Sequence, residues 1–391
     1  MKTVFKIAMK IPERFDNMRS LEDSEVREAV LTLLRDPEFK EVIRKLVKGV
    51  PIWVHKLYTR RFKTVSSFQM GVIRPFLNKI IADNSTGFTN DFSALPAGRE
   101  NFIFLSNHRD IVLDPALLSY ILLKSGKKSV EIGIGNNLLF RPWVETLVRL
   151  NRSFIVNRSA TVSELLESSK TLSEYIRFVI QEKKSPVWLA QREGRAKDSD
   201  DRTQTSVLKM LAMSGNEGSL KKRLQSLHIT PLTISYEYDP CDWLKAAEFQ
   251  LKRDNPDFVK SDRDDFINIK TGLSGYKGHI HYHAAAPIDD EIDALDESVP
   301  RNQFLKQVGD IIDNHIFKGY RIYPCNRIAL DMLRGDQSQA GLYSDAEKRA
   351  FEEYLAGQLA KIEIANPDLD YLREKILVMY ANPLINQLNS I

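Results

Sequence analysis

The feature that most constrains the fold is a regular alternation of short apolar runs with helical segments between residues 101 and 238. The runs are short, apolar and bounded by turn-forming residues, which is the pattern of buried strands. They are NFIFLS, SVEIGIG, SFIVN, PVWLA and ITPLTISYEY, and GHIHYHAAAPI is expected to add one more strand. Strands that alternate with helices predict an α/β fold, with a mostly parallel central sheet flanked by helices.

The remaining segments have helical patterns and divide the chain into three predicted regions. We expect a helical N-terminal extension over residues 1–90, an α/β domain over 91–290 and a helical C-terminal region over 291–391. The turn-rich stretch NSTGFTNDFSALPAGRE is the first candidate boundary. Residues 252–278 are charged and rich in turn formers, so they are interpreted as a loop insertion.

Composition excludes several classes of protein. The 391 residues are 43% hydrophobic and 28% charged, which is typical of a globular chain. Only two cysteines are present, Cys241 and Cys325, which exclude a disulfide framework and suit a reducing, cytoplasmic compartment. No apolar run approaches the roughly 20 residues that cross a bilayer. The chain lacks a phosphate loop, a complete dinucleotide fingerprint and a GxSxG elbow.

The most informative segment is SNHRDIVLDPALL, residues 106–118. His108 directly follows a buried strand and precedes a helix, and open α/β sheets carry their chemistry at this edge. A nearby carboxylate can orient an imidazole and raise its basicity, and both Asp110 and Asp114 are candidates. The alternative interpretation is a strand-end histidine beside a helix-capping aspartate.

The next strand ends also carry polar residues. Arg158 follows the strand SFIVN, and Glu193, Gly194 and Arg195 follow PVWLA. Two arginines beside a glycine that allows close backbone approach suit a phosphate group. His279, His281 and His283 share one face of a strand, but without a neighbouring cysteine or carboxylate in that strand they are expected to be ordinary polar residues rather than metal ligands.

The order of these motifs resembles the glycerolipid acyltransferases, the enzymes that acylate glycerol 3-phosphate or 1-acylglycerol 3-phosphate. NHRDIVLDPALL resembles the family's His–four residues–Asp motif, SFIVNR its second motif, EGR its third and ITPLTISYEY its fourth. The intervening IGIGNNLLFRPWVETLVRL is also similar, and the resemblance covers about residues 100–290. Within the family, LSYILLKSG and SYEYDPCDWLKAAEF favour the glycerol 3-phosphate branch.

The resemblance implies a reaction and a set of roles. His108 would take a proton from the acceptor hydroxyl, which attacks the thioester of acyl-CoA or of an acyl-carrier protein. Arg158 and Arg195 would hold the acceptor's phosphate, Glu193 would orient the site or bind glycerol hydroxyls, and backbone donors near His108 would stabilise the oxyanion. No metal or redox cofactor is implied.

Two departures from the family pattern bear on these roles. Five residues, not four, separate His108 from Asp114, so the loop must bulge if Asp114 is the partner, and Asp110 is the alternative. EGR is also one residue shorter than the usual third motif. A non-catalytic lipid-binding protein with the same fold is therefore a competing hypothesis, and a distance of about 3.2 Å or less between His108 and a carboxylate would favour the enzyme.

The net charge of +4 conceals one basic segment. Between Val42 and Ala82 there are nine basic residues and no acidic ones, which leaves −5 for the rest of the chain. Beside an acyltransferase-like domain we expect this segment to bind an anionic membrane surface peripherally, with Trp53, Leu57 and Phe62 in the interface. Nucleic acid is the disfavoured partner, because no known nucleic-acid-binding module is present.

Overall fold

The computed structural model describes residues 10–46, 59, 61–139, 141–157, 162–216 and 218–390, with the side chains of 45, 46, 162, 163 and 262 left out. Its centre is a seven-stranded sheet with the order β1-β7-β6-β2-β5-β3-β4. The strands are β1 Gly87–Asp91, β2 Ile103–Ser106, β3 Glu131–Gly135, β4 Ser153–Val156, β5 Val187–Ala190, β6 Ile229–Tyr236 and β7 His279–Ala284. All described strand pairs are parallel except β6 with β7, so the predicted α/β fold with a mostly parallel sheet is confirmed.

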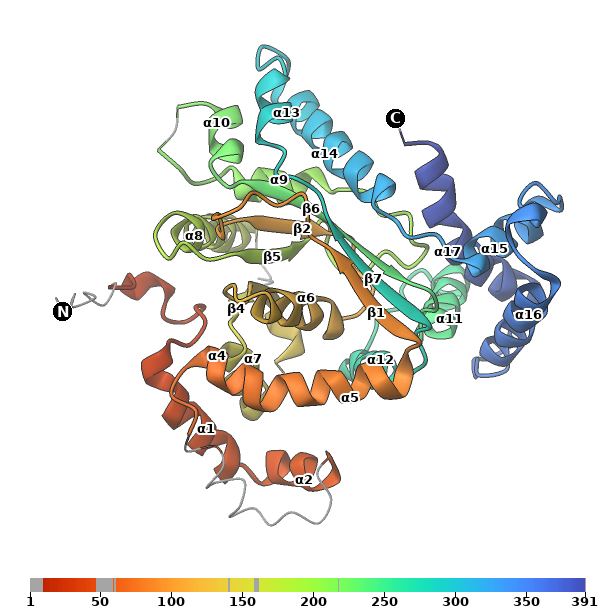
Figure 1. Ribbon diagram of the computed structural model, residues 1–391, viewed down its shortest axis with the longest axis horizontal. Coiled ribbons are helices and arrows are strands. Elements are labelled where there is room, and N and C mark those ends of the chain that lie inside the picture. The colour runs from red at the N-terminus through yellow and green to blue at the C-terminus, as the bar shows by residue number, and fades with distance from the viewer. Residues whose placement is uncertain are drawn as a thin grey trace.

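Helices cover both faces of the sheet and extend beyond its two ends (Figure 1). Those of the N-terminal half are α1 Val26–Arg35, α2 Pro37–Leu46, α4 Val65–Phe68, α5 Arg74–Asn84, α6 Leu113–Lys124, α7 Pro142–Leu150 and α8 Val162–Gln181. Those of the C-terminal half are α9 Thr205–Leu211, α10 Leu220–Gln225, α11 Asp242–Asp254, α12 Asp262–Ser274, α13 Asp289–Ala294, α14 Arg301–Lys318, α15 Pro324–Arg334, α16 Asp345–Leu359 and α17 Leu369–Leu388. Among the described residues, no helix is both long enough and apolar enough to cross a bilayer.

Two apolar clusters hold the sheet between its helices. On one face, α8, α9 and α14 pack through residues such as Tyr175, Leu208 and Phe304. On the other face, α5 and α6 pack through residues such as Leu77 and Leu117. β2 lies in the middle of the sheet and is buried along its whole length, so the loop that follows β2 is fixed from both faces.

The helices at the two ends of the chain form their own clusters. α1 and α4 pack with α7 through residues that include Leu33, Phe68 and Leu150. α15, α16 and α17 pack on α11 through residues that include Ile328 and Leu377. Figure 1 places α11 with α15–α17 at one end of the sheet and α1 and α2 at the opposite end.

The structure corrects two predictions about loops. The turn-rich stretch that follows α5 contains the edge strand β1, which pairs with β7. The last three residues of β1 are exposed, so this strand lacks the apolar pattern of a buried strand. Residues 252–278 are not a loop insertion, because they contain α12, which begins with a capping box formed by Ser261 and Asp264.

The basic segment is described only in part. Trp53, Leu57, Lys48, Lys56 and Arg60 lie outside the described residues. Arg44, Arg61, Lys63, Arg74 and Lys79 are described, and all of them are exposed. Phe62, which was expected in the membrane interface, is only 5% exposed: it packs edge-on against Phe68 within the apolar cluster that includes residues of α1 and α4.

Candidate active site

The loop between β2 and α6 brings His108 and Asp114 together. His108 Nδ1 lies 2.8 Å from Asp114 Oδ2. The same carboxylate oxygen accepts hydrogen bonds from the backbone N–H groups of Arg109, at 2.6 Å, and Asp110, at 3.0 Å. In the tautomer whose Nδ1–H donates to this fully buried carboxylate, Nε2 is unprotonated, and it has no hydrogen-bond partner among the described residues.

The five-residue spacing is absorbed by a turn at residues 109–112. α6 begins at Leu113, so Asp114 is its second residue and points back toward the end of β2. Asp110 plays a different part, because its Oδ1 accepts from the backbone N–H groups of Val112, at 2.8 Å, and Leu113, at 2.7 Å. The alternative partner for His108 is thus wrong, since Asp110 caps α6. Burial, followed by the charge of Asp114, raises the pKa of Asp110.

Three aromatic residues from neighbouring strands complete the surroundings of this pair. Tyr236 of β6 donates from its hydroxyl to Asp114 Oδ1 at 3.1 Å, and Tyr282 of β7 donates to the backbone oxygen of Asp114 at 3.2 Å. Trp188 of β5 packs edge-on against the His108 ring, with 5.3 Å between ring centroids. None of these contacts was predicted, because each depends on which strands are neighbours in the sheet.

Residues on either side of His108 fix its loop to the rest of the protein. Asn107 exchanges hydrogen bonds with both backbone groups of Ile234 in β6, at 2.8 and 2.9 Å. Arg109 is buried and forms an ion pair of 2.6 Å with Asp201, which also accepts from the hydroxyl of Tyr320 at 2.5 Å. Asp201 follows β5, so this ion pair joins the His108 loop to the loop that carries Glu193–Arg195.

The loop after β5 places the third motif on the same side of the sheet. Gly194 has a φ of 68°, a left-handed conformation that glycine adopts without strain. The Glu193 side chain is exposed, and its backbone N–H donates to Gln204 Oε1 at 2.8 Å. Arg195 donates to Asn268 Oδ1 of α12 at 2.8 Å, a contact that no sequence signal indicated. Arg158, the other predicted phosphate ligand, lies outside the described residues.

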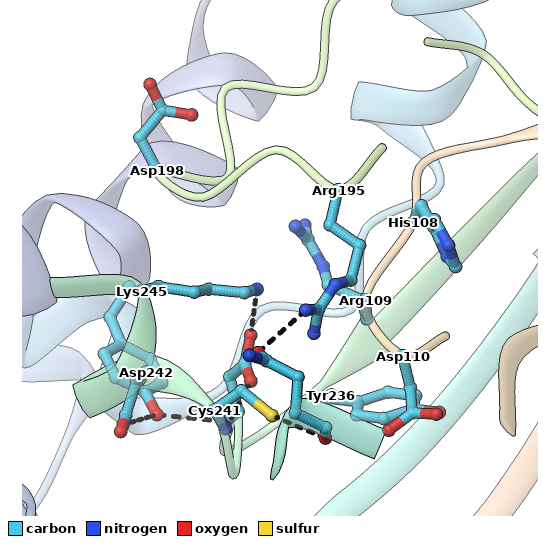
Figure 2. A network of polar contacts seen from close by, with 12 residues as sticks. His108, Arg109, Asp110, Arg195, Asp198, Tyr236, Cys241, Asp242 and Lys245 are labelled. Atoms are coloured by element: carbon cyan, nitrogen blue, oxygen red, sulfur yellow. Dashed lines mark hydrogen bonds and ion pairs between the residues drawn. The ribbon is translucent and has the colours of Figure 1, made fainter. Parts of the chain in front are cut away.

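Arg195 lies within an acidic environment in the interior of the domain. Figure 2 shows its guanidinium between Lys245 and His108, whereas Asp198 lies apart from them. Burial alone would lower the pKa of Arg195, but nearby groups that include Asp239 and Asp110 outweigh burial and raise it. Arg195 is therefore cationic at any physiological pH.

A cavity of about 2620 Å³ contains the predicted residues His108, Glu193, Gly194 and Arg195 in its wall. Much of the wall is apolar and comes from α1, α5, α6 and α7, for example Leu33, Phe76, Leu123 and Leu147. The polar part includes lysines of α11 and of the loops beside it. A space with an apolar region, a polar region and a histidine suits an amphiphilic substrate.

The described backbone donors beside His108 are mostly engaged within the loop itself. The N–H groups of Arg109 and Asp110 bind Asp114, and those of Val112 and Leu113 bind Asp110. The expectation that backbone donors near His108 stabilise an oxyanion therefore fails for these four groups. The described residues include no cluster of three or more histidine, cysteine or acidic side chains that could hold a metal ion.

Comparison with known proteins gives a match to a family model and a likeness to solved structures. Residues 88–235 match the family model described as Acyltransferase, a segment that runs from β1 through β6 and includes His108, Asp114 and Arg195. The crystal structure of PlsC from Thermotoga maritima, titled a 1-acyl-sn-glycerophosphate (LPA) acyltransferase, is similar at 10% sequence identity and a TM-score of 0.39. That likeness covers 76% of this chain and 100% of the other. A search of curated proteins found no match.

Proposed function

Residues 88–235 belong to the acyltransferase family, and from this premise we propose that the protein transfers a fatty acyl group from an acyl thioester to a hydroxyl of glycerol 3-phosphate. The observation that carries the proposal is the 2.8 Å contact between His108 and a buried carboxylate in the wall of a largely apolar cavity. This distance meets the requirement for a general base held by a carboxylate. A carboxylate that only stabilised the turn would need no contact with the imidazole, so the pair favours the enzyme over a non-catalytic lipid-binding protein.

The proposed mechanism needs only this pair and two aligned substrates. His108 Nε2 accepts the proton of the acceptor hydroxyl while Asp114 holds the Nδ1–H and stabilises the imidazolium that forms. The hydroxyl oxygen attacks the thioester carbonyl, and the tetrahedral intermediate collapses with loss of the thiolate. His108 then returns its proton to the thiolate sulfur, so no acyl-enzyme is formed. Alignment of both substrates supplies much of the rate enhancement.

Arg195 is the described cation best suited to the acceptor phosphate. It lines the cavity with His108, and its contact with Asn268 uses one of its five N–H donors. Glu193, which lies next to Gly194 at the same wall, is proposed to orient the glycerol hydroxyls. Acylation of 1-acylglycerol 3-phosphate is the alternative reaction, since it uses the same phosphate and the same base.

The direct test is an assay with purified protein, a radiolabelled long-chain acyl-CoA and either acceptor. We expect a monoacyl product from glycerol 3-phosphate, and its formation should be abolished in His108→Ala. Arg195→Ala should raise the KM for the phosphorylated acceptor more than the KM for the thioester. Full activity of His108→Ala would exclude the mechanism, and product from only the 1-acylated acceptor would favour the alternative reaction.

We also propose that the protein associates peripherally with anionic membranes through its basic segment. The support is the exposure of all five described cations of that segment, which include Arg61 and Lys63. Each is worth about 1 kcal/mol near an anionic surface. The double variant Arg61→Glu/Lys63→Glu should bind anionic vesicles more weakly in a sedimentation assay, and unchanged binding would refute this proposal.

A further inference from the structure

Three lysines surround a single buried carboxylate in the wall of the cavity. Glu248 of α11 is 4% exposed and forms ion pairs with Lys197, with Lys252 at 3.0 Å and with Lys260 at 2.6 Å. We call these four residues the Glu248 cluster. Its lysines come from three segments, the loop after β5, α11 and the loop between α11 and α12, so only the folded chain brings them together.

The cluster carries more positive charge than its own carboxylate can neutralise. Three ammonium groups face one carboxylate, which leaves a formal excess of two positive charges. Burial lowers the pKa of Lys197 to about 8 despite its bond to Glu248. Burial also opposes ionisation of Glu248, yet the lysines hold its pKa at about 2, so the carboxylate stays charged. The positive charge of the lysines that Glu248 does not neutralise would stabilise a second anion at this place.

The cluster lies in the wall of the proposed substrate cavity. All four residues line the same cavity as His108 and Arg195. Lys252 is seven residues beyond Lys245 on α11, which places it about 10 Å further along the helix. Lys245 itself binds Asp239, and Arg195 binds Asn268, so these two cations belong to the polar network near His108 (Figure 2).

Building on the proposed function, we propose that the Glu248 cluster binds the phosphate groups of the nucleotide part of an acyl-CoA donor. Glycerol 3-phosphate carries one phosphate, for which Arg195 lies close to His108. Coenzyme A carries a diphosphate and a phosphate monoester at the end of the molecule remote from the thioester. Lysine binds phosphate as a compact point charge, and several lysines together suit several phosphates. The proposal thus takes coenzyme A, rather than a carrier protein, as the donor.

The binding test uses coenzyme A without an acyl chain, so that apolar contacts do not mask the phosphates. Isothermal titration calorimetry is performed on the 391-residue protein and on Lys252→Ala/Lys260→Ala. We expect the Kd for coenzyme A to rise about tenfold in the double variant, since two charge-assisted contacts are lost. Dephospho-coenzyme A, which lacks the phosphate monoester, should bind the unmodified protein more weakly and be less sensitive to the variant.

A matched control is Lys306→Ala. Lys306 of α14 is also an exposed lysine paired with the carboxylate four residues away, Asp310, at 2.7 Å, but it does not line the cavity. Coenzyme A affinity should not change in this variant. An unchanged affinity in Lys252→Ala/Lys260→Ala, or an equal loss in Lys306→Ala, would overturn the inference.

Acyl transfer measured on the same preparations separates this inference from the proposed function. If the unmodified protein transfers no acyl group, the proposed function fails. If it is active and the double variant changes the KM for glycerol 3-phosphate but not the affinity for coenzyme A, the cluster binds the acceptor and the inference is wrong. A higher KM for acyl-CoA with an unchanged KM for glycerol 3-phosphate supports the donor assignment.

Discussion

Asp114 is the residue on which the orientation of His108 depends most directly. Its carboxylate accepts hydrogen bonds from His108, from the hydroxyl of Tyr236 and from the backbone N–H groups of Arg109 and Asp110. These partners compensate for the removal of a charged group from water. They also fix the orientation of the carboxylate, so that its Oδ2 stays in contact with Nδ1 of His108. Because Oδ2 accepts from both Nδ1 of His108 and the two backbone N–H groups, the proposed catalytic contact of Asp114 and its contacts in the turn use the same oxygen.

Asp114→Asn is expected to lower kcat by about 100-fold with little change in either KM. An amide can no longer stabilise the imidazolium, and its NH₂ group can force the wrong tautomer on His108. The control is Asp110→Asn, four residues away, because asparagine caps a helix about as well as aspartate. We expect this control to keep most of its activity. Equal losses of kcat in the two variants, measured in the same acyl-transfer assay, would contradict the assignment.

The residues of the site differ in how well sequence alone predicts them. His108 and Asp114 lie in one short segment, so their proximity follows from the motif together with a turn. Asp201 and Asn268 are ordinary polar residues of a loop and a helix far along the chain. Their contacts with Arg109 and Arg195 arise from strand order and from the packing of α12, which no local pattern encodes.

At the scale of elements, the buried strands are predictable because helices cover both faces of the sheet, which makes each strand a continuous apolar run. The helices between them are predictable from their own helical spacing of apolar residues. β1 is an edge strand with exposed residues, and α12 begins with the charged run DRDD, so neither has that pattern. The reversal of β7 relative to β6 is likewise absent from the sequence pattern, because alternation alone does not fix direction. Tertiary pairing determines β1 and the direction of β7, whereas α12 begins with a local capping box within a highly charged stretch.

α11 joins the sheet to the C-terminal helices through Asp242, its first residue. This buried carboxylate accepts from the hydroxyls of Tyr354 of α16 and Tyr380 of α17, each at 2.8 Å. Burial, followed by the charge of Asp239, raises the pKa of Asp242 to about 7 from 3.8. The folded protein therefore binds a proton here that the unfolded chain has released at pH 5 to 7.

The raised pKa predicts a pH dependence of stability with a definite sign. The contribution of Asp242 is fully present below about pH 4 and is lost as the pH rises through 7, at a slope of at most about 1.4 kcal/mol per pH unit. Asp242→Asn should remove this slope. Urea unfolding at pH 5, 6, 7 and 8 measures it, with the exposed Asp310→Asn as control. If both variants and the unmodified protein show the same slope, Asp242 is not the group responsible.

At the scale of the whole molecule, the C-terminal helix α17 supports the loop that carries the third motif. Asn382 donates to the backbone oxygen of Asp198 at 2.8 Å, and Asn386 donates to Asp200 Oδ1 at 3.2 Å. Arg202 donates to Asn386 Oδ1 at 3.1 Å. Asp201, which binds Arg109 beside His108, lies within this same stretch, so a helix near the end of the chain holds both halves of the candidate site.

We therefore expect Asn382→Ala/Asn386→Ala to impair catalysis although neither residue lines the cavity. Loss of these hydrogen bonds should weaken the loop by about 1 kcal/mol and lower kcat/KM about fivefold. Amide hydrogen exchange over residues 196–203 should become faster, while exchange in β2 should not change. The control is Glu374→Ala, which removes an exposed side chain of α17 that pairs with Lys375. Unaltered exchange in the loop together with normal activity would show that α17 does not support the site.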